Sequence, residues 1–112
     1  EVDLEEGKLM TRFHKVRESN TKTVKKKNED FLNKNGRLYC EVCDFDFVKE
    51  YGSSVDGFIE CHYTKFLYDY DEPTKTSITD LVLLCSNCHR MIHRKKPWLS
   101  IDELKDVKGV SR

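Results

Sequence analysis

The sequence lacks an apolar run long enough to cross a bilayer, and it lacks the N-terminal pattern of a secretory signal. A membrane span needs about 20 consecutive apolar residues, and no stretch of the 112 residues approaches that length. The first six residues, Glu-Val-Asp-Leu-Glu-Glu, have neither the basic start nor the apolar stretch of a signal peptide. We therefore expect a soluble intracellular protein that does not act at a membrane.

Core-forming residues are also scarce. Hydrophobic residues make up 38% of the chain and charged residues 36%. A chain of this length forms one domain, and it buries only about two thirds of the surface that its unfolded form exposes. Because few residues remain to build a core, we expect an additional stabilising element, and zinc is the first candidate.

Net charge is absent as well, since 20 basic residues balance 20 acidic ones. The charges are nevertheless segregated along the chain. The segment 8–28 holds eight basic residues and one acid, whereas 44–80 holds nine acids and three bases. Local charge rather than net charge must therefore decide whether nucleic acid is a partner.

The first third of the chain has the periodicity of helices. Apolar positions predict helical structure between Leu4 and Asn35, and the Ser-Asn-Thr cluster at 19–21 leaves open whether this is one helix or two. After Gly36 the sequence pattern changes to short apolar and aromatic runs. These runs predict short strands at 38–39, around 45–47, at 57–62 and at 81–84.

The remaining segments predict one loop and two helices. The polar segment 69–79 has no apolar periodicity and is typical of a surface loop. Residues 86–94 predict a short helix that Pro97 ends. Ser100 and Glu103 have the spacing of a capping box, which predicts a last helix to about residue 107.

Four of the five cysteines form two Cys-x-x-Cys pairs, Cys40 with Cys43 and Cys85 with Cys88. In a reducing compartment this pattern favours metal binding over disulfides. Two intervening residues let the backbone place both sulfurs on one face of a tetrahedral ion, and four thiolates close its coordination sphere. A structural zinc site is therefore predicted, and such a site contributes on the order of 10 kcal/mol to folding.

Two alternatives to the zinc site remain open: four ordinary reduced thiols, and a redox pair of the thioredoxin kind. The redox reading would need a Cys pair at a helix start within a βαβ unit, and nothing in the sequence supports one. Cys61 lies outside both pairs and alternates with Ile59 along the expected strand. We expect it to be a small buried side chain rather than a fifth ligand.

Three histidines form a second candidate metal site. His89 and His93 lie four residues apart on an expected helix, which puts both imidazoles on one face. His62 would supply a third ligand if a turn brings it beside that helix. Three protein ligands leave an open coordination position, as in catalytic metal sites. The alternative is a pair of surface histidines, but the second cysteine pair would anchor the start of the same helix and fix the imidazoles.

Together these motifs resemble the His-Asn-His (HNH) endonuclease family, which has the ββα-metal fold. The resemblance is carried by Cys-Glu-Val-Cys at 40–43, Gly-Phe-Ile-Glu-Cys-His at 57–62 and Asp-Leu-Val-Leu-Leu-Cys-Ser-Asn-Cys-His-Arg-Met-Ile-His at 80–93. It implies an α+β fold with a small ββα-metal nuclease domain and its structural zinc over residues 36–99. A helical extension over 1–35 would precede this domain, and a C-terminal helix and tail over 100–112 would follow it.

By position, the resemblance implies that His62, His89 and His93 hold a catalytic divalent metal, which would be Mg²⁺, Mn²⁺, Ni²⁺ or Zn²⁺. The four paired cysteines would hold the structural zinc. Two positions depart from the family pattern. Tyr63 stands where a second histidine normally acts as the general base, and a phenol with a pKa of about 10 is a poor base at neutral pH. Asp80 stands where many members have the middle asparagine, and it can accept the same hydrogen bonds.

The resemblance therefore implies a metal-dependent DNA endonuclease whose catalytic positions are His62, Tyr63, Asp80 and His89. Loss of a positioned base commonly costs ~10²- to 10⁴-fold in rate, so we expect weak or absent cleavage with DNA binding retained. The alternative is a catalytically inactive, zinc-stabilised DNA-binding module. Three accounts of Tyr63 remain open: a natural degenerate homologue, a site that uses the phenolate, or a laboratory His-to-Tyr change. We favour inactivation.

DNA is the expected partner, and two basic surfaces are candidates for holding it. One follows the histidine-bearing helix, and the other is the N-terminal basic stripe, although either can be an ordinary solvated face. The sequence pattern is similar to that of the C-terminal nuclease module of bacterial restriction-type proteins, which implies a cytoplasmic, bacterial location. It leaves open a homodimer or a longer chain with a DNA-recognition domain. The first surface comprises Arg90, Arg94, Lys95 and Lys96, and the stripe comprises Lys8, Arg12, Lys15, Lys22, Lys25, Lys26 and Lys27.

Overall fold

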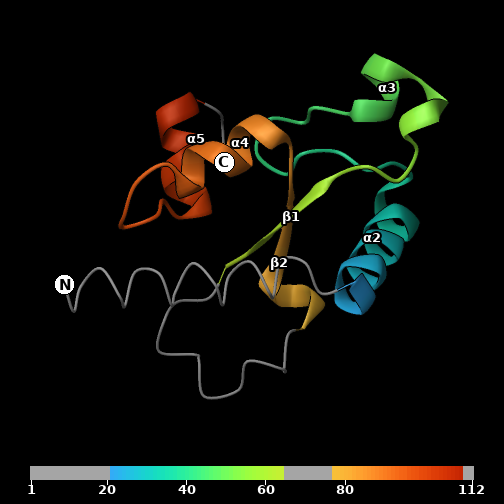
Figure 1. Ribbon diagram of the computed structural model, residues 1–112, viewed down its shortest axis with the longest axis horizontal. Coiled ribbons are helices and arrows are strands. Elements are labelled where there is room, and N and C mark those ends of the chain that lie inside the picture. The colour runs from blue at the N-terminus through green and yellow to red at the C-terminus, as the bar shows by residue number, and fades with distance from the viewer. Residues whose placement is uncertain (1–20, 65–76, 110–112) are drawn as a thin grey trace.

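The computed structural model describes residues 21–64 and 77–109, in which helices surround a two-stranded sheet (Figure 1). This mixture of helices with a small sheet confirms the predicted α+β fold. The elements are α2 (Thr21–Asn35), α3 (Phe47–Tyr51), the 3₁₀ turn η1 (Ser53–Val55), β1 (Glu60–Tyr63), the 3₁₀ turn η3 (Ile78–Asp80), β2 (Leu81–Leu84), α4 (Ser86–His93) and α5 (Ile101–Lys108).

Strands β1 and β2 pair antiparallel as a hairpin at the centre of the molecule. Because side chains alternate along a strand, each strand contributes two residues to each face of the sheet. Their register pairs Glu60 with Leu84, Cys61 with Leu83, His62 with Val82, and Tyr63 with Leu81.

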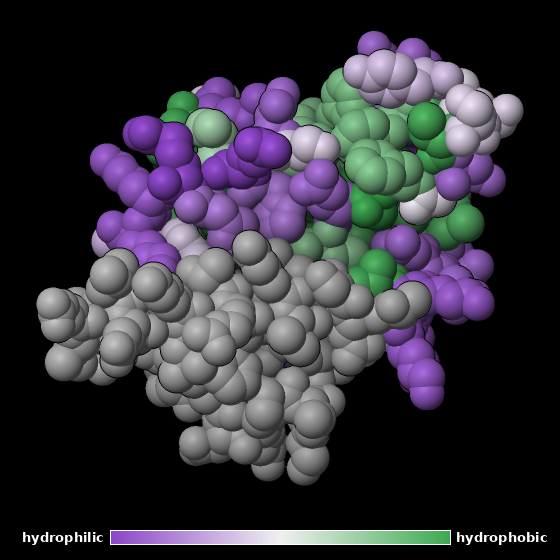
Figure 2. Space-filling model, viewed as in Figure 1, coloured by the Kyte–Doolittle hydropathy of each residue, from purple (hydrophilic) through white to green (hydrophobic). Residues whose placement is uncertain are grey.

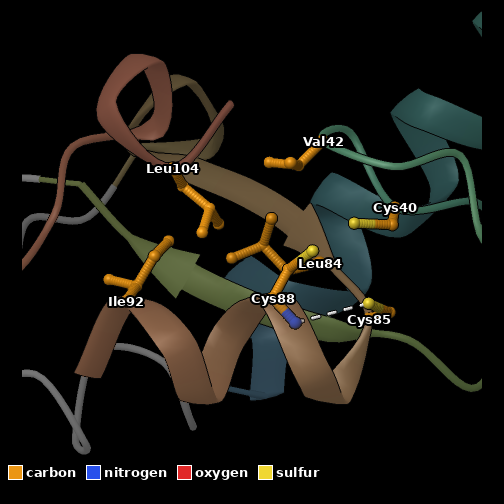
Figure 3. Close-up of a cluster of buried hydrophobic side chains, with 7 residues drawn as sticks. All are labelled: Cys40, Val42, Leu84, Cys85, Cys88, Ile92 and Leu104. Carbon is orange, nitrogen blue, oxygen red and sulfur yellow. Dashed lines mark hydrogen bonds between the residues drawn. The ribbon is translucent and has the colours of Figure 1, made fainter. Parts of the chain in front are cut away.

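Each face of the hairpin packs against its own apolar cluster. On one face, Phe31 of α2 packs with the odd-numbered strand residues, and this cluster comprises Phe31, Ile59, Cys61, Tyr63, Leu81 and Leu83. The other face packs against α4 and α5. Its cluster, drawn in Figure 3, comprises Cys40, Val42, Leu84, Cys85, Cys88, Ile92 and Leu104. Three of the paired cysteines are therefore part of a core that α4, α5 and β2 share.

The regular elements from Glu60 onward follow the sequence prediction closely. Strand β2 and helix α4 lie where they were expected, and α2 ends one residue before Gly36. Strand β1 covers the second half of the strand expected at 57–62 and extends one residue beyond it. The capping box that starts α5 is present, because Ser100 accepts a hydrogen bond from the Glu103 amide and the Glu103 carboxylate accepts one from the Ser100 amide. The choice between one or two N-terminal helices, and most of the 69–79 loop, lie outside the described residues.

The strands predicted around the first cysteine pair were wrong. Residues 38–39 and 57–59 form no strand, and 47–51 form the short helix α3 instead. For 47–51 the reason is local capping. The buried carboxylate of Asp46 accepts a hydrogen bond from the Lys49 amide at 3.0 Å, and Arg37 pairs with it at 3.1 Å. An N-cap of this kind favours a helix over an extended strand.

We expect Leu104→Ala to be the most damaging truncation in α5. The side chain is 1% exposed and lies in the cluster that also contains Ile92 and the cysteines. Removing it should lower the free energy of unfolding by about 2–5 kcal/mol, measured by urea denaturation of the zinc-loaded protein. The matched control is Val107→Ala on the same helix, because Val107 is 74% exposed. Equal losses in the two variants would contradict the packing of α5 described above.

Within the described ranges, no helix has the length and apolar character that crossing a membrane requires.

Candidate metal centres

The first cysteine pair lies on a tight turn between α2 and α3. The Asp44 amide donates to the Cys40 carbonyl at 2.9 Å, and the Cys40 amide donates to the Phe45 carbonyl at 2.9 Å. Asp44 has a φ of 67°, a left-handed conformation that Asp and Asn tolerate better than most residues. The turn folds the chain back on itself and brings both sulfurs of the pair to one side.

The second pair begins helix α4. Cys85 is the N-cap residue, and its sulfur accepts a hydrogen bond from the Cys88 amide at 3.4 Å (Figure 3). All four sulfurs lie within 4.8 Å of one another, and the sulfurs of Cys43 and Cys85 are 3.7 Å apart. Two thiolates on one tetrahedral zinc, each about 2.3 Å from the ion, are separated by about 3.8 Å. The sulfur spacing and the donor set therefore fit zinc.

The acid–base properties of these thiols also favour a cation. Burial raises the pKa of both Cys43 and Cys88, and the negative charge that Cys40 carries as a thiolate raises them further. Burial opposes ionisation of Cys40 as well, but hydrogen bonds, led by that of the Cys85 backbone, outweigh it and lower its pKa. Four thiolates crowded together repel one another, and a divalent ion removes this repulsion. The donor set and the spacing of the cluster are therefore consistent with a bound metal ion.

Glu41, between the first two cysteines, attaches this turn to the edge of the sheet. Its amide donates to the Leu83 carbonyl at 2.8 Å, and its carboxylate accepts from the Leu83 amide at 2.7 Å. Lys27 of α2 lies 3.6 Å from the same carboxylate. The residue thus satisfies both backbone groups of Leu83 on the outer edge of β2. Sequence reasoning missed this contact, because no local pattern marks a glutamate whose amide and carboxylate bind the edge of a strand as a neighbouring strand would.

The three predicted histidines come together between β1 and α4. His62 of β1 faces His89 and His93 of α4, and their candidate ligand atoms lie within 4.8 Å of one another. Nδ1 of His62 and Nε2 of His93 are 3.2 Å apart. Two nitrogens bound to one tetrahedral ion at about 2.0–2.1 Å are about 3.3 Å apart. The donor set and this spacing fit a divalent metal with three imidazole ligands and an open position.

The surroundings hold the imidazoles in place from two sides. His62 is only 5% exposed, and the indole of Trp98 packs edge-on against His93 with ring centroids 4.4 Å apart. On the opposite side, Nδ1 of His89 lies 2.8 Å from a carboxylate oxygen of Glu60. Sequence reasoning missed Glu60. Its position two residues before His62 was the available signal, because residues i and i+2 of a strand share a face.

Tyr63 lies away from the three imidazoles, and Asp80 lies just before the start of β2. The Tyr63 side chain is 2% exposed and belongs to the cluster with Phe31 and Leu81, on the face of the hairpin opposite to His62. The carboxylate of Asp80 accepts a hydrogen bond from the Ser77 amide, and its carbonyl accepts two from Thr64. Asp80 therefore joins the end of β1 to the start of β2. The catalytic roles of both residues stay predictions.

The predicted phosphate-binding residues are exposed near the end of α4 that carries His93. They occupy the last turn of the helix and the residues just after it, and Lys96 also lies over the Trp98 ring at 5.6 Å from its centroid. In Figure 2, hydrophilic side chains gather over the α4 and α5 end, while hydrophobic ones gather between the hairpin and α3. The exposed residues are Arg90, Arg94, Lys95 and Lys96.

Comparison with known proteins identifies a family. The model of a family described as HNH endonuclease matches residues 40–95, which is half of the chain. The matched segment contains both cysteine pairs and all three clustered histidines. No curated protein and no solved structure matches the chain.

Proposed function

Because this chain belongs to the HNH endonuclease family, we propose that it is a metal-dependent DNA endonuclease module of a restriction-type protein, impaired by Tyr63. Nuclease function follows from the family, whose members act on DNA. The observation that carries the proposal is the group of three imidazoles from β1 and α4, whose spacing fits a divalent ion. The nuclease domain would span 36–99, with a helical extension over 1–35 and a C-terminal helix and tail over 100–112.

In this proposal the two metal centres have different tasks. Cys40, Cys43, Cys85 and Cys88 hold a structural zinc that fixes the start of α4 and stabilises the small core. His62, His89 and His93 hold a divalent metal, which would be Mg²⁺, Mn²⁺, Ni²⁺ or Zn²⁺. When bound, that metal stabilises the charge that develops on the phosphate and the leaving 3′ oxygen during hydrolysis. The three imidazoles would orient the metal, and a phosphate oxygen would bind it at the position that they leave open.

The identity and position of residue 63 support the impairment. At neutral pH only about one phenol in a thousand is ionised, and a buried phenol among apolar neighbours is ionised even less. The Tyr63 ring packs with Phe31 and Leu81 rather than with the imidazoles. A water bound near His62 would therefore lose the side chain that takes its proton in other members. Asp80 would take the part of the middle asparagine, because it ties the ends of the hairpin together.

DNA would lie along the hydrophilic end of α4. Exposed guanidinium and ammonium groups neutralise phosphates without regard to base sequence, and four such groups follow His89 within seven residues. They are Arg90, Arg94, Lys95 and Lys96. Part of the N-terminal stripe, from Lys8 to Lys15, lies outside the described residues. Sequence selection would then require a recognition domain elsewhere in a longer chain or a second copy of this one, in a bacterial cytoplasm.

A plasmid-nicking assay tests the proposal. The present chain should nick DNA slowly or not at all with Mg²⁺, Mn²⁺, Ni²⁺ or Zn²⁺. Tyr63→His should increase the rate by ~10²- to 10⁴-fold, because an imidazole accepts a proton at neutral pH and a phenol does not. Since residue 63 is the last of β1, the polar imidazole can leave the apolar Phe31 cluster and turn toward His62. Tyr63→Phe is the matched control. It preserves the apolar ring in the Phe31 cluster and should leave the rate unchanged.

The outcomes of this assay separate the explanations of Tyr63. Absence of cleavage by both the present chain and Tyr63→His, with both proteins folded and both metals bound, would contradict the endonuclease proposal. A loss of cleavage in Tyr63→Phe would give the phenolate a catalytic role.

A second candidate function is a catalytically inactive, zinc-stabilised DNA-binding module. The burial of Tyr63 away from the imidazoles favours it specifically, because no described histidine other than the three in the cluster can replace the missing base. In that case, a gel-shift titration would show DNA binding that weakens with salt. Cleavage would stay absent in Tyr63→His, while exchange of the four basic residues after His89 for alanine would weaken binding.

A further inference from the structure

Glu60 uses both of its carboxylate oxygens on the histidine side of the hairpin. Oε1 lies 2.8 Å from Nδ1 of His89, and Oε2 accepts a hydrogen bond from the hydroxyl of Ser86 at 2.7 Å. Ser86 and His89 lie in the first two turns of α4, whereas Glu60 is the first residue of β1. The Glu60 carboxylate therefore links β1 to α4 at His89, whose imidazole faces those of His62 and His93.

The contact also decides which nitrogen of His89 carries the lone pair. An ionised carboxylate can only accept hydrogen bonds, so Nδ1 carries the proton and donates it to Oε1. In a neutral imidazole the other nitrogen, Nε2, then has the lone pair. Imidazoles that ligate metals commonly donate their second N–H to a carboxylate, and this contact fixes the ring orientation and raises the basicity of the ligating nitrogen.

We propose that Glu60 is a positioning residue for the divalent metal, which holds His89 in the Nδ1–H form with Nε2 directed to the ion that His62 and His93 share. Ser86 supports this arrangement, because its hydroxyl holds the second oxygen of Glu60 and so fixes the carboxylate plane. This inference rests on the proposed function, since it assigns the three imidazoles to a metal.

An ordinary ion pair is the competing explanation. Glu60 and His89 are partly shielded, with side chains 31% and 16% exposed, and pairs of this kind can contribute to stability without any metal. Such a pair would change the free energy of unfolding when it is broken. Breaking an ordinary ion pair would not change both the preferred tautomer of His89 and the affinity of the site for a metal. Those two measurements therefore separate a positioning role from a structural one.

The first measurement is the affinity for Ni²⁺, by calorimetry, of protein whose cysteine site is loaded with zinc. Glu60→Ala should weaken Ni²⁺ binding by about 10- to 100-fold, the usual effect of losing the partner of a metal-bound imidazole. Glu60→Gln keeps an oxygen that can accept from Nδ1–H, and it should recover much of this loss. Glu50→Ala is the control, because Glu50 is exposed on α3, and it should bind Ni²⁺ as the unchanged protein does.

The second measurement is the tautomer of His89 by ¹⁵N NMR, without Ni²⁺ and with the cysteine site zinc-loaded. The unchanged protein should show a protonated Nδ1 at His89, and Glu60→Ala should lose this preference. Ser86→Ala removes only the support of the carboxylate, so it should weaken Ni²⁺ binding less than Glu60→Ala does. Combined with Glu60→Ala it should add nothing further, because the two residues act through one contact.

The results distinguish this inference from the proposed function. If the unchanged protein does not bind Ni²⁺ through its histidines, the proposed function fails. If it binds Ni²⁺ and Glu60→Ala binds equally well with the same His89 tautomer, only the positioning role is overturned. Unfolding or loss of zinc in Glu60→Ala, together with unaltered Ni²⁺ binding and tautomer in Ser86→Ala, would also overturn it, because Glu60 would then be structural.

Discussion

Cys88→Ser is expected to abolish tight zinc binding and to leave the domain largely unfolded at 25 °C. Cys88 is 2% exposed and packs in the same cluster as Leu84, Ile92 and Leu104. A structural zinc contributes on the order of 10 kcal/mol to folding, which is comparable to the whole free energy of unfolding of a small domain. Circular dichroism and zinc content of the purified variant measure the effect.

The fifth cysteine provides the control for this experiment. Cys61 is also buried, but its sulfur lies 4.0 Å from the side-chain oxygen of Asn28 and outside the zinc cluster. Cys61→Ala should therefore keep one tightly bound zinc and lose only about 1 kcal/mol of stability. A folded, zinc-free Cys88→Ser protein would show that the core does not depend on the ion, and it would contradict the zinc assignment.

The histidine cluster should respond in the opposite way, with loss of activity and retention of the fold. His89→Ala removes one of three imidazole ligands and should reduce metal-dependent nicking, measured in the Tyr63→His background, by more than about 100-fold. This figure is the upper range for losing only an outer partner of a ligand. The thermal midpoint should change little, because His89 is only partly buried and belongs to neither apolar cluster.

Met91→Ala is the matched control for this variant, since Met91 lies on the same helix and is 48% exposed. It should nick DNA as its Tyr63→His parent does. If His89→Ala kept the nicking rate of its parent, the divalent metal would not be held as proposed. If it lost the cysteine-bound zinc as well, the two centres would not be separate.

Much of the fold could be predicted because its signals are local. The Cys-x-x-Cys spacing, the four-residue spacing of His89 and His93, and the apolar run at 81–84 each reflect a single turn, helix or strand. Antiparallel pairing of β1 with β2 then places His62 beside α4, which the prediction of His62 as a third metal ligand required. The family match covers this same part of the chain.

The features that could not be predicted depend on contacts between distant segments. The Glu41 carboxylate meets the Leu83 amide far along the chain, and no periodicity marks either residue. Helix α3 is too short for apolar periodicity to reveal, and its start depends on the cap that Asp46 provides. One feature was within reach. Adjacent residues of a strand face opposite sides, so a buried β1 already implied that Tyr63 points away from His62.

The central claim is that one chain holds two metals with separate tasks, and metal counting by native mass spectrometry tests it most directly. After dialysis, the unchanged protein should retain one zinc, and addition of Ni²⁺ should add one further ion that mild chelation removes. His89→Ala should retain the zinc and fail to bind the added ion. A protein that never binds more than one metal, or a His89→Ala variant that still binds two, would contradict the claim.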